Sequence, residues 1–258
     1  GNPQRASARV SPNGEWLGFL APVDGILNVW AAPIDDLQAA KPVTKDKVRD
    51  IRGFSWAYTG DHVLYTQDKE GDENWHVYAT DVATGDTTDL TPVDGVNARI
   101  MGVSEKFPRE ILVGLNDRIP QLHDIYRVNI ETAERELIQE NEGVAAYIAD
   151  HDFNIRFSLN FTPTGGQELL KAETSEAGET FWTDFLEVGP EDAMTTGPAG
   201  FDRTNRQLYL LDSRDRNTGA LYSVDIATGE KTLIAEHEKA DVDEIIAHPT
   251  KKTIQAVG

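Results

Sequence analysis

Two short polar triplets in the sequence contain the residue types that bind carboxylates. The triplet from Asn116 to Arg118 is Asn-Asp-Arg, and the triplet from Asp212 to Arg214, 96 residues later, is Asp-Ser-Arg. Asp68 lies 48 residues before Asn116. A guanidinium group can bind a carboxylate through two parallel hydrogen bonds. These five residues are therefore candidate binding residues, and each arginine could bind a peptide carboxylate or pair locally with an acid and order its own loop.

No segment predicts a catalytic residue. Residues 53–57 read Gly-Phe-Ser-Trp-Ala, which begins like the Gly-x-Ser-x-Gly elbow of a serine nucleophile but has alanine in place of the second glycine. The elbow needs a helix after the serine, whereas the next residues predict a turn and a strand. We therefore predict that Ser55 is an ordinary strand residue.

The sequence predicts no metal site and no other cofactor. Asp68, Glu70 and Asp72 alternate as acids do in a calcium-binding loop, but the segment lacks that loop's glycine and its final acid. We interpret it as an exposed turn, with a loose ion site as the alternative. The six histidines show no zinc-type spacing, and the chain has no cysteine.

The elements that must position these residues repeat along the chain. The segment 77–86, VYATDVATGD, has counterparts at 125–134 and 221–230, at offsets of 48 and 144 residues. Each consists of a strand and an Asx-x-x-Thr turn, and a second short strand follows it. Two further alternating strands precede each copy, so the unit has four short strands. A fixed period of this length is typical of repeat architectures.

Four antiparallel strands per repeat predict an all-β fold, a β-propeller whose four-stranded blades number about five, followed by the start of a sixth. A β-sandwich or a stack of hairpins would explain the alternation but not the constant step. The last repeat stops after two strands, so we expect a piece of a longer protein. The expected blades cover residues 6–45, 50–92, 97–140, 144–190 and 196–237, with a partial blade at 241–258.

The charge balance restricts the partners that we expect. The chain has 44 acidic and 24 basic residues, a net charge of −20. A polyanion repels nucleic acids and anionic lipids, so we expect neither as a partner. No apolar run is long enough to span a membrane. The absence of cysteine does not distinguish a periplasmic from a cytoplasmic bacterial location.

Five stretches together resemble the N-terminal propeller of bacterial prolyl oligopeptidase family serine peptidases, in the dipeptidyl aminopeptidase and acylaminoacyl peptidase branch. They cover residues 1–30, 68–81, 111–129, 149–159 and 208–225. The resemblance implies that an α/β-hydrolase domain carries a Ser-Asp-His triad and that the propeller admits only short peptides to it. No such hydrolase domain is present in this chain, so we expect no catalysis from the chain itself.

The resemblance leads to two hypotheses. In the first, the chain is the non-catalytic propeller of a serine peptidase, which gates access of short peptides and docks against its own C-terminal hydrolase domain. In that case the face that holds Arg118 and Arg214 could also bridge to acids of that domain. In the second, it is a stand-alone TolB-like propeller that acts as a binding or scaffold module. A third possibility, an enzyme acting in the propeller's own channel, would need converging titratable groups, which the repeats do not show.

Overall fold

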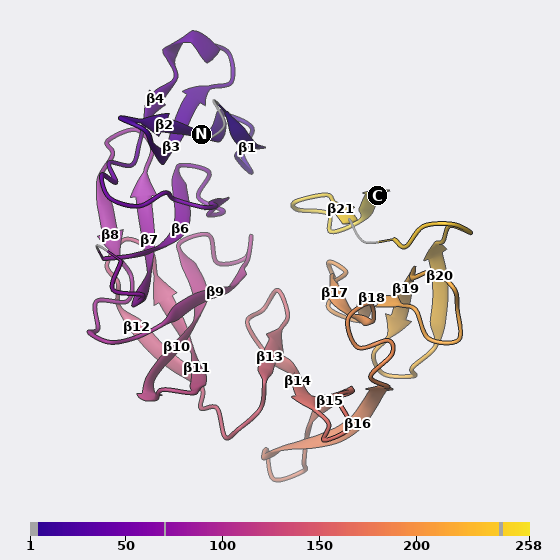
Figure 1. Cartoon of the computed structure of the whole chain (residues 1–258). Helices are drawn as coiled ribbons and strands as arrows, with labels where there is room; N and C mark the ends of the chain where they lie inside the picture. The colour runs from indigo at the N-terminus through magenta and orange to yellow at the C-terminus, as the bar shows by residue number, and fades with distance from the viewer. Residues whose placement is uncertain (1–4, 70, 243–244) are drawn as a thin grey trace. The chain divides into compact units, whose positions relative to one another are not determined.

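The computed structural model describes residues 5–69, 71–242 and 245–258. Strands build nearly all of its regular structure, and the described residues form one short 3-10 helix, Leu37–Ala39. Five sheets have four antiparallel strands each, paired in chain order, and a sixth has two. The all-β propeller class predicted from the repeats is therefore confirmed (Figure 1). The chain forms two compact units, residues 1–143 and 144–258, which we describe separately.

The first unit contains three sheets. Sheet 1 consists of β1 (Ala6–Val10), β2 (Trp16–Val23), β3 (Ile26–Pro33) and β4 (Lys41–Pro42). Sheet 2 consists of β5 (Ser55–Trp56), β6 (His62–Asp68), β7 (Trp75–Asp81) and β8 (Thr87–Asp89). Sheet 3 consists of β9 (Ala98–Val103), β10 (Glu110–Ile119), β11 (Leu122–Asn129) and β12 (Arg135–Gln139).

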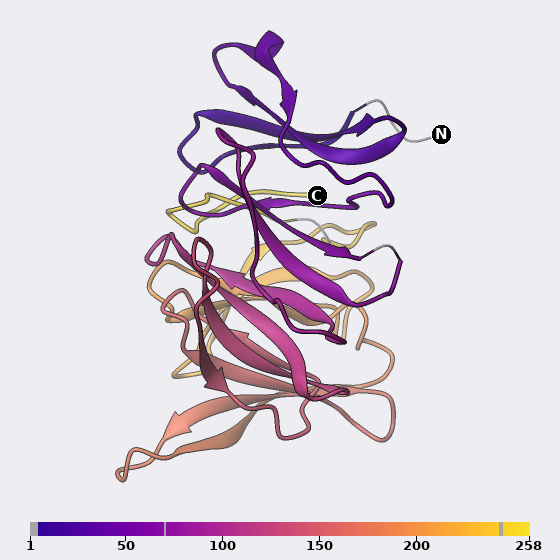
Figure 2. The ribbon, with the colours of Figure 1, turned by 90° about the vertical axis from the view of Figure 1, so that its left-hand side faces the viewer.

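The second unit contains two complete sheets and a pair of strands. Sheet 4 consists of β13 (Ala146–Ala149), β14 (Ile155–Phe161), β15 (Gln167–Thr174) and β16 (Thr180–Val188). Sheet 5 consists of β17 (Gly197–Phe201), β18 (Gln207–Asp212), β19 (Ala220–Asp225) and β20 (Lys231–Ala235). The last pair is β21 (Ile245–Ala247) and β22 (Ile254–Val257). In sheet 4, the hairpin of β15 and β16 extends beyond the short strand β13 (Figure 2).

The repeated Asx-x-x-Thr turn forms as the sequence predicts. The side chain of Asp81 accepts hydrogen bonds from the backbone N–H groups two and three residues later, at 2.8 and 2.9 Å. Asn129 and Asp225 make the same pair of bonds in sheets 3 and 5. Gly85 has a φ of 77°, and Ala133 adopts a φ of 59° at the matching position. The turn therefore requires a left-handed residue, which glycine provides at lower cost than alanine.

Sheet 2 buries both of its faces, which distinguishes a propeller blade from one layer of a sandwich. On β6, Val63 and Tyr65 pack into an apolar cluster with sheet 1, whose members include Leu20 and Val29. Leu64, which points the other way, packs into a second cluster with sheet 3 that includes Val113. Successive side chains of a strand point to opposite faces, so one strand contributes to both clusters.

The second unit has its own core between sheets 4 and 5. Phe157 on β14 is fully buried and packs with Phe201 of β17 and with Leu208 and Leu210 of β18. Its ring centroid lies 4.8 Å from that of Phe185. Burying one side chain of this size stabilises a fold by about 1.5–3 kcal/mol relative to leaving it exposed. This cluster joins the two sheets and so orders the loops at their edges.

Candidate functional site

The five candidate binding residues all lie at or next to one edge of their sheets. Antiparallel strands alternate in direction, so the loop between the second and third strands leaves a sheet at the same edge as the connector to the next sheet. We call this the connector edge. In the first unit it comprises residues 24–25, 43–54, 71–74, 90–97, 120–121 and 140–143; in the second it comprises 162–166, 189–196, 213–219 and 236–242.

Arg118 holds the end of sheet 3 against its outgoing connector. Its Nε and Nη2 donate to the two carboxylate oxygens of Asp124 at 2.7 Å each, and Nη2 also donates to the carbonyl oxygen of Asn141 at 2.9 Å. Asp124 on β11 is 1% exposed. The hydrogen bonds from Arg118 lower the pKa of Asp124 despite its burial. Both carboxylate oxygens of Asp124 are therefore bound within the chain, while the Arg118 side chain stays partly exposed.

Arg214 makes a similar arrangement at the connector edge of sheet 5. Its Nε and Nη2 donate to the two carboxylate oxygens of Asp212 at 2.9 Å each, and Nη1 donates to the carbonyl oxygen of Glu187 at 3.0 Å. Lys231 donates to Asp212 from the outer strand at 2.5 Å. Burial disfavours the charged form of Asp212, but the bonds from Arg214 and Lys231 outweigh it and hold the pKa of this carboxyl well below its usual range.

The remaining two candidates also tie loops to strands. Asp68 is buried at the end of β6 and forms an ion pair with Arg49, which comes from the connector between sheets 1 and 2. The side-chain oxygen of Asn116 accepts a hydrogen bond from the backbone N–H of Asn97 at 2.6 Å, and its amide donates to the carbonyl oxygen of Pro120 at 2.8 Å. Each residue therefore anchors a connector or a hairpin end.

The two triplets are less equivalent in structure than their spacing indicates. Arg118 lies inside β10, within the register irregularity between Leu115 and Ile119, whereas Arg214 lies in the loop after β18. Only the second triplet brings its own first and third residues, Asp212 and Arg214, together. The partner Asp124 was missed because the matching positions one period before it and two periods after it carry no carboxylate.

 These matching positions are His76, 48 residues before Asp124, and Ala220, 96 residues after it. The repeat pattern therefore gave no signal for this carboxylate.

The other segments singled out from the sequence form ordinary elements. Ser55 lies in β5, as predicted, and a turn and a strand follow it. Asp72 accepts hydrogen bonds from the backbone N–H groups of Lys69 and Asn74, as expected of a turn residue, while Glu70 lies outside the described residues. Within the described ranges, no group of three or more His, Cys, Asp or Glu side chains could hold a metal ion. In the same ranges, no helix is long and apolar enough to cross a membrane.

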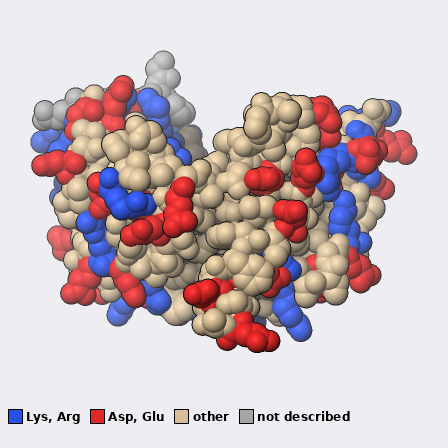
Figure 3. Space-filling view, turned by 90° about the horizontal axis from the view of Figure 1, so that it is seen from below, with Lys and Arg blue, Asp and Glu red and all other residues tan. Residues whose placement is uncertain are grey.

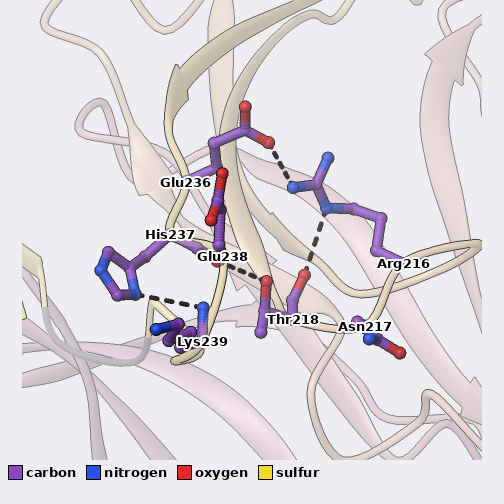
Figure 4. A pocket seen from close by; sticks show the side chains of 7 residues that line it. All are labelled: Arg216, Asn217, Thr218, Glu236, His237, Glu238 and Lys239. Carbon is purple, nitrogen blue, oxygen red and sulfur yellow. Dashed lines mark hydrogen bonds and ion pairs between the residues drawn. The ribbon is translucent and has the colours of Figure 1, made fainter.

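A polar cavity of about 740 Å³ lies at the connector edge of sheet 5 (Figure 4). The guanidinium of Arg216 occupies one side of it, paired with Glu236 and donating to the carbonyl oxygen of Thr218 at 3.1 Å. The hydroxyl of Thr218 donates to the carbonyl oxygen of His237 at 2.6 Å. The polar groups of this cavity therefore bind one another, which orders the segment that follows β20.

Acidic and basic side chains are interspersed over the face seen in Figure 3. The net charge of −20 therefore forms no continuous acidic surface on that face. A mixed surface of this kind favours solubility more than it favours one charged partner.

The sheets and their connectors define the class of protein as a β-propeller. Two solved structures share this fold with TM-scores of 0.51 each. The β-propeller domain of the Trilobed protease from Pyrococcus furiosus is 18% identical, and the match covers 94% of this chain and 73% of that one. TolB from Acinetobacter baumannii is 14% identical, and the match covers 88% of this chain and 53% of that one. At these identities the likeness shows the fold alone.

A curated relative is more similar in sequence. Dipeptidyl aminopeptidase BIII from Pseudoxanthomonas mexicana is 43% identical over 258 residues, which is all of this chain and 37% of that protein. No protein-family model matches the chain. The chain spans little more than a third of the length of the curated relatives it matches. The resemblance to the propellers of prolyl oligopeptidase family peptidases is confirmed by these matches.

Proposed function

We propose that the chain is the non-catalytic propeller domain of a serine peptidase that removes dipeptides from the N-terminus of short peptides. The observation that carries this proposal is the 43% identity over the whole chain to part of a dipeptidyl aminopeptidase. In this proposal the blades keep the boundaries given above, and an α/β-hydrolase domain outside the chain supplies the catalytic triad. The propeller restricts access by size and docks against that domain.

The connector edge supports the docking part of the proposal. Arg118 in the first unit and Arg214 in the second each fix a loop through a buried carboxylate, so the connector edge of each unit offers an ordered surface. An ordered surface loses little conformational entropy on association, which favours a stable contact between domains. Both guanidinium groups remain partly exposed, at 38% and 30% of the side chain, and could therefore reach acids of a partner domain.

The proposal can be tested with the chain and a separately produced hydrolase domain from the same protein. We expect the two to associate in solution, and we expect the complex but not the chain to hydrolyse dipeptidyl nitroanilides. The complex should reject long unfolded polypeptides that the hydrolase domain by itself accepts. Failure of the two parts to associate, together with equal activity on short and long substrates, would refute both docking and gating.

Substitution of Arg118 and Arg214 by alanine in the complete protein separates the roles of the connector edge. A rise in the KM for dipeptidyl substrates at unchanged kcat indicates substrate contact, whereas loss of association indicates domain contact. If KM and association both stay unchanged, the two arginines order their own loops only. A reading frame that ends soon after Gly258, with no hydrolase partner, would instead favour the stand-alone TolB-like module.

A further inference from the structure

A groove in the first unit differs in charge from the rest of the chain. It has a volume of about 480 Å³ and lies between sheets 2 and 3, along the beginnings of β5 and β9. None of its lining residues is an aspartate or a glutamate, although the whole chain has 44 of them. Cavities elsewhere in the chain have acids in their walls, among them Glu236, Asp61 and Asp46. The groove is therefore depleted of negative charge.

The groove carries one exposed cation, Arg99 on β9. Within the described part of the chain, no carboxylate forms an ion pair with its guanidinium group. Arg99 also acts on the imidazole of His123. Burial is the main cause that lowers the pKa of this ring, and the positive charge of Arg99 lowers it further. The Nε2 of His123 is hydrogen-bonded to the carbonyl oxygen of Asn97 at 2.9 Å, which places this ring beside the same strand.

Other groups in the groove fit the main chain and side chains of a peptide. Asn97, Ser55 and Thr66 line it with side-chain amide and hydroxyl groups that have no hydrogen-bond partner among the described residues. Trp75 and Ile100 add apolar surface. A concave site with apolar walls and a few polar groups is typical of small-ligand binding. A guanidinium group in such a site favours a planar carboxylate, which it binds through two hydrogen bonds.

The first strands of the unit extend the same positive character. β1, β5 and β9 contain Arg9 and Arg99 and no acidic residue, and Arg52 lies three residues before β5. In a propeller the first strand of each blade lies nearest the axis, along which a substrate would pass. Positive charges at this position repel cationic peptides and attract anionic ones.

We propose that the groove between β5 and β9 binds the carboxylate of a short peptide, with Arg99 as the residue that determines this preference. Asn97, Ser55 and Thr66 donate hydrogen bonds to the peptide, and Trp75 contacts its apolar part. The identification of the ligand as a peptide rests on the proposed function, whereas the carboxylate preference rests on the groove.

The test compares two probes that differ only in charge, acetyl-trialanine with a free C-terminal carboxylate and the same peptide as its amide. Isothermal titration calorimetry on the chain should show about tenfold tighter binding of the carboxylate form, since hydrogen bonds to charged groups contribute this much or more. Arg99→Gln should reduce the affinity for the carboxylate to that for the amide. Arg99→Lys, which keeps the charge but not the planar fork, should retain part of the preference.

The matched control is Arg109→Gln, which also removes one positive charge from an exposed side chain of the same unit. We expect it to leave the preference unchanged. Equal affinities for the two peptides, no saturable binding at about 1 mM, or the same loss in Arg109→Gln would each overturn the proposal. Because the chain by itself is titrated, these outcomes do not depend on whether a hydrolase domain docks.

Discussion

Replacement of Asp212 by asparagine tests whether the connector edge of sheet 5 depends on a buried charge. The carboxylate, 1% exposed, accepts four hydrogen bonds, three from Arg214 and one from Lys231. Removing one partner of a buried ion pair costs about 3–5 kcal/mol. The side chains of Arg214 and Lys231 are 30% and 38% exposed, so water can hydrate them after the change. We therefore expect a loss of about 3 kcal/mol, at the lower end of that range.

Thermal unfolding followed by circular dichroism measures this loss. For a chain of this size, about 3 kcal/mol corresponds to a Tm lower by about 6–12 °C. The matched control is Asp184→Asn on β16, an exposed aspartate whose side chain has no partner among the described residues. Surface changes of this kind cost less than about 0.5 kcal/mol. Equal Tm values for the two variants would refute the role assigned to the Asp212 carboxylate.

The pH dependence of the stability difference between the wild type and Asp212→Asn tests whether the negative charge of Asp212 causes that difference. The pKa of Asp212 is depressed in the folded chain, while an unfolded aspartate titrates near about 3.9. The stability that the carboxylate contributes is therefore present above about pH 4 and is lost as the pH falls below it. The difference between the wild type and Asp212→Asn should narrow in acid. A difference that stays constant from neutral pH into this range would contradict the electrostatic explanation.

Three further changes test the packing between sheets. Burial raises the pKa of Tyr78 to about 12. Absorbance at alkaline pH should therefore show a phenolate step near that pH, which Tyr78→Phe removes. The stability that the neutral tyrosine contributes is lost as the pH rises through about 10–12. Both Gly60 and Gly95 have positive φ, but only at Gly60 would a new Cβ meet the side chain of Asn13, at 2.4 Å. Gly60→Ala should therefore lower the free energy of unfolding by about 1 kcal/mol more than Gly95→Ala does, an amount comparable to the loss of one hydrogen bond. Phe157→Ala should lower the free energy of unfolding by about 3–5 kcal/mol, and Phe157→Leu by much less, because leucine fills most of the space. Equal effects within either pair, in urea unfolding, would contradict these assignments.

The sequence predicted the architecture because the features that determine it are local and repeated. The bonds of Asp81 and Asn129 to the backbone of their own turns are encoded within four residues, and the same turn recurs at a constant spacing. Sheet 4 lacks this turn, yet its strands β14 and β15 still pair antiparallel. The two buried faces of sheet 2 follow from apolar residues at consecutive positions of β6.

The partners of the candidate residues could not be predicted, because they depend on the paths of loops. Arg49 reaches Asp68 from a connector whose course no repeat specifies. Arg118 pairs with Asp124 within the irregular part of β10, where the register with β11 shifts between Leu115 and Ile119 and no repeat specifies the neighbours. The groove around Arg99 was also missed, since it is defined by missing acids in two strands that are 43 residues apart in sequence. Spacing identifies equivalent positions, but it does not identify neighbours across sheets.

Because sheet 2 packs against a neighbour on each face, its stability is a sum of contacts with the sheet before it and the sheet after it. Duplication of one gene segment of about 48 codons would add a unit whose two faces already match those of its neighbours. Evolution can therefore change the number of blades without redesigning the interior of any existing sheet.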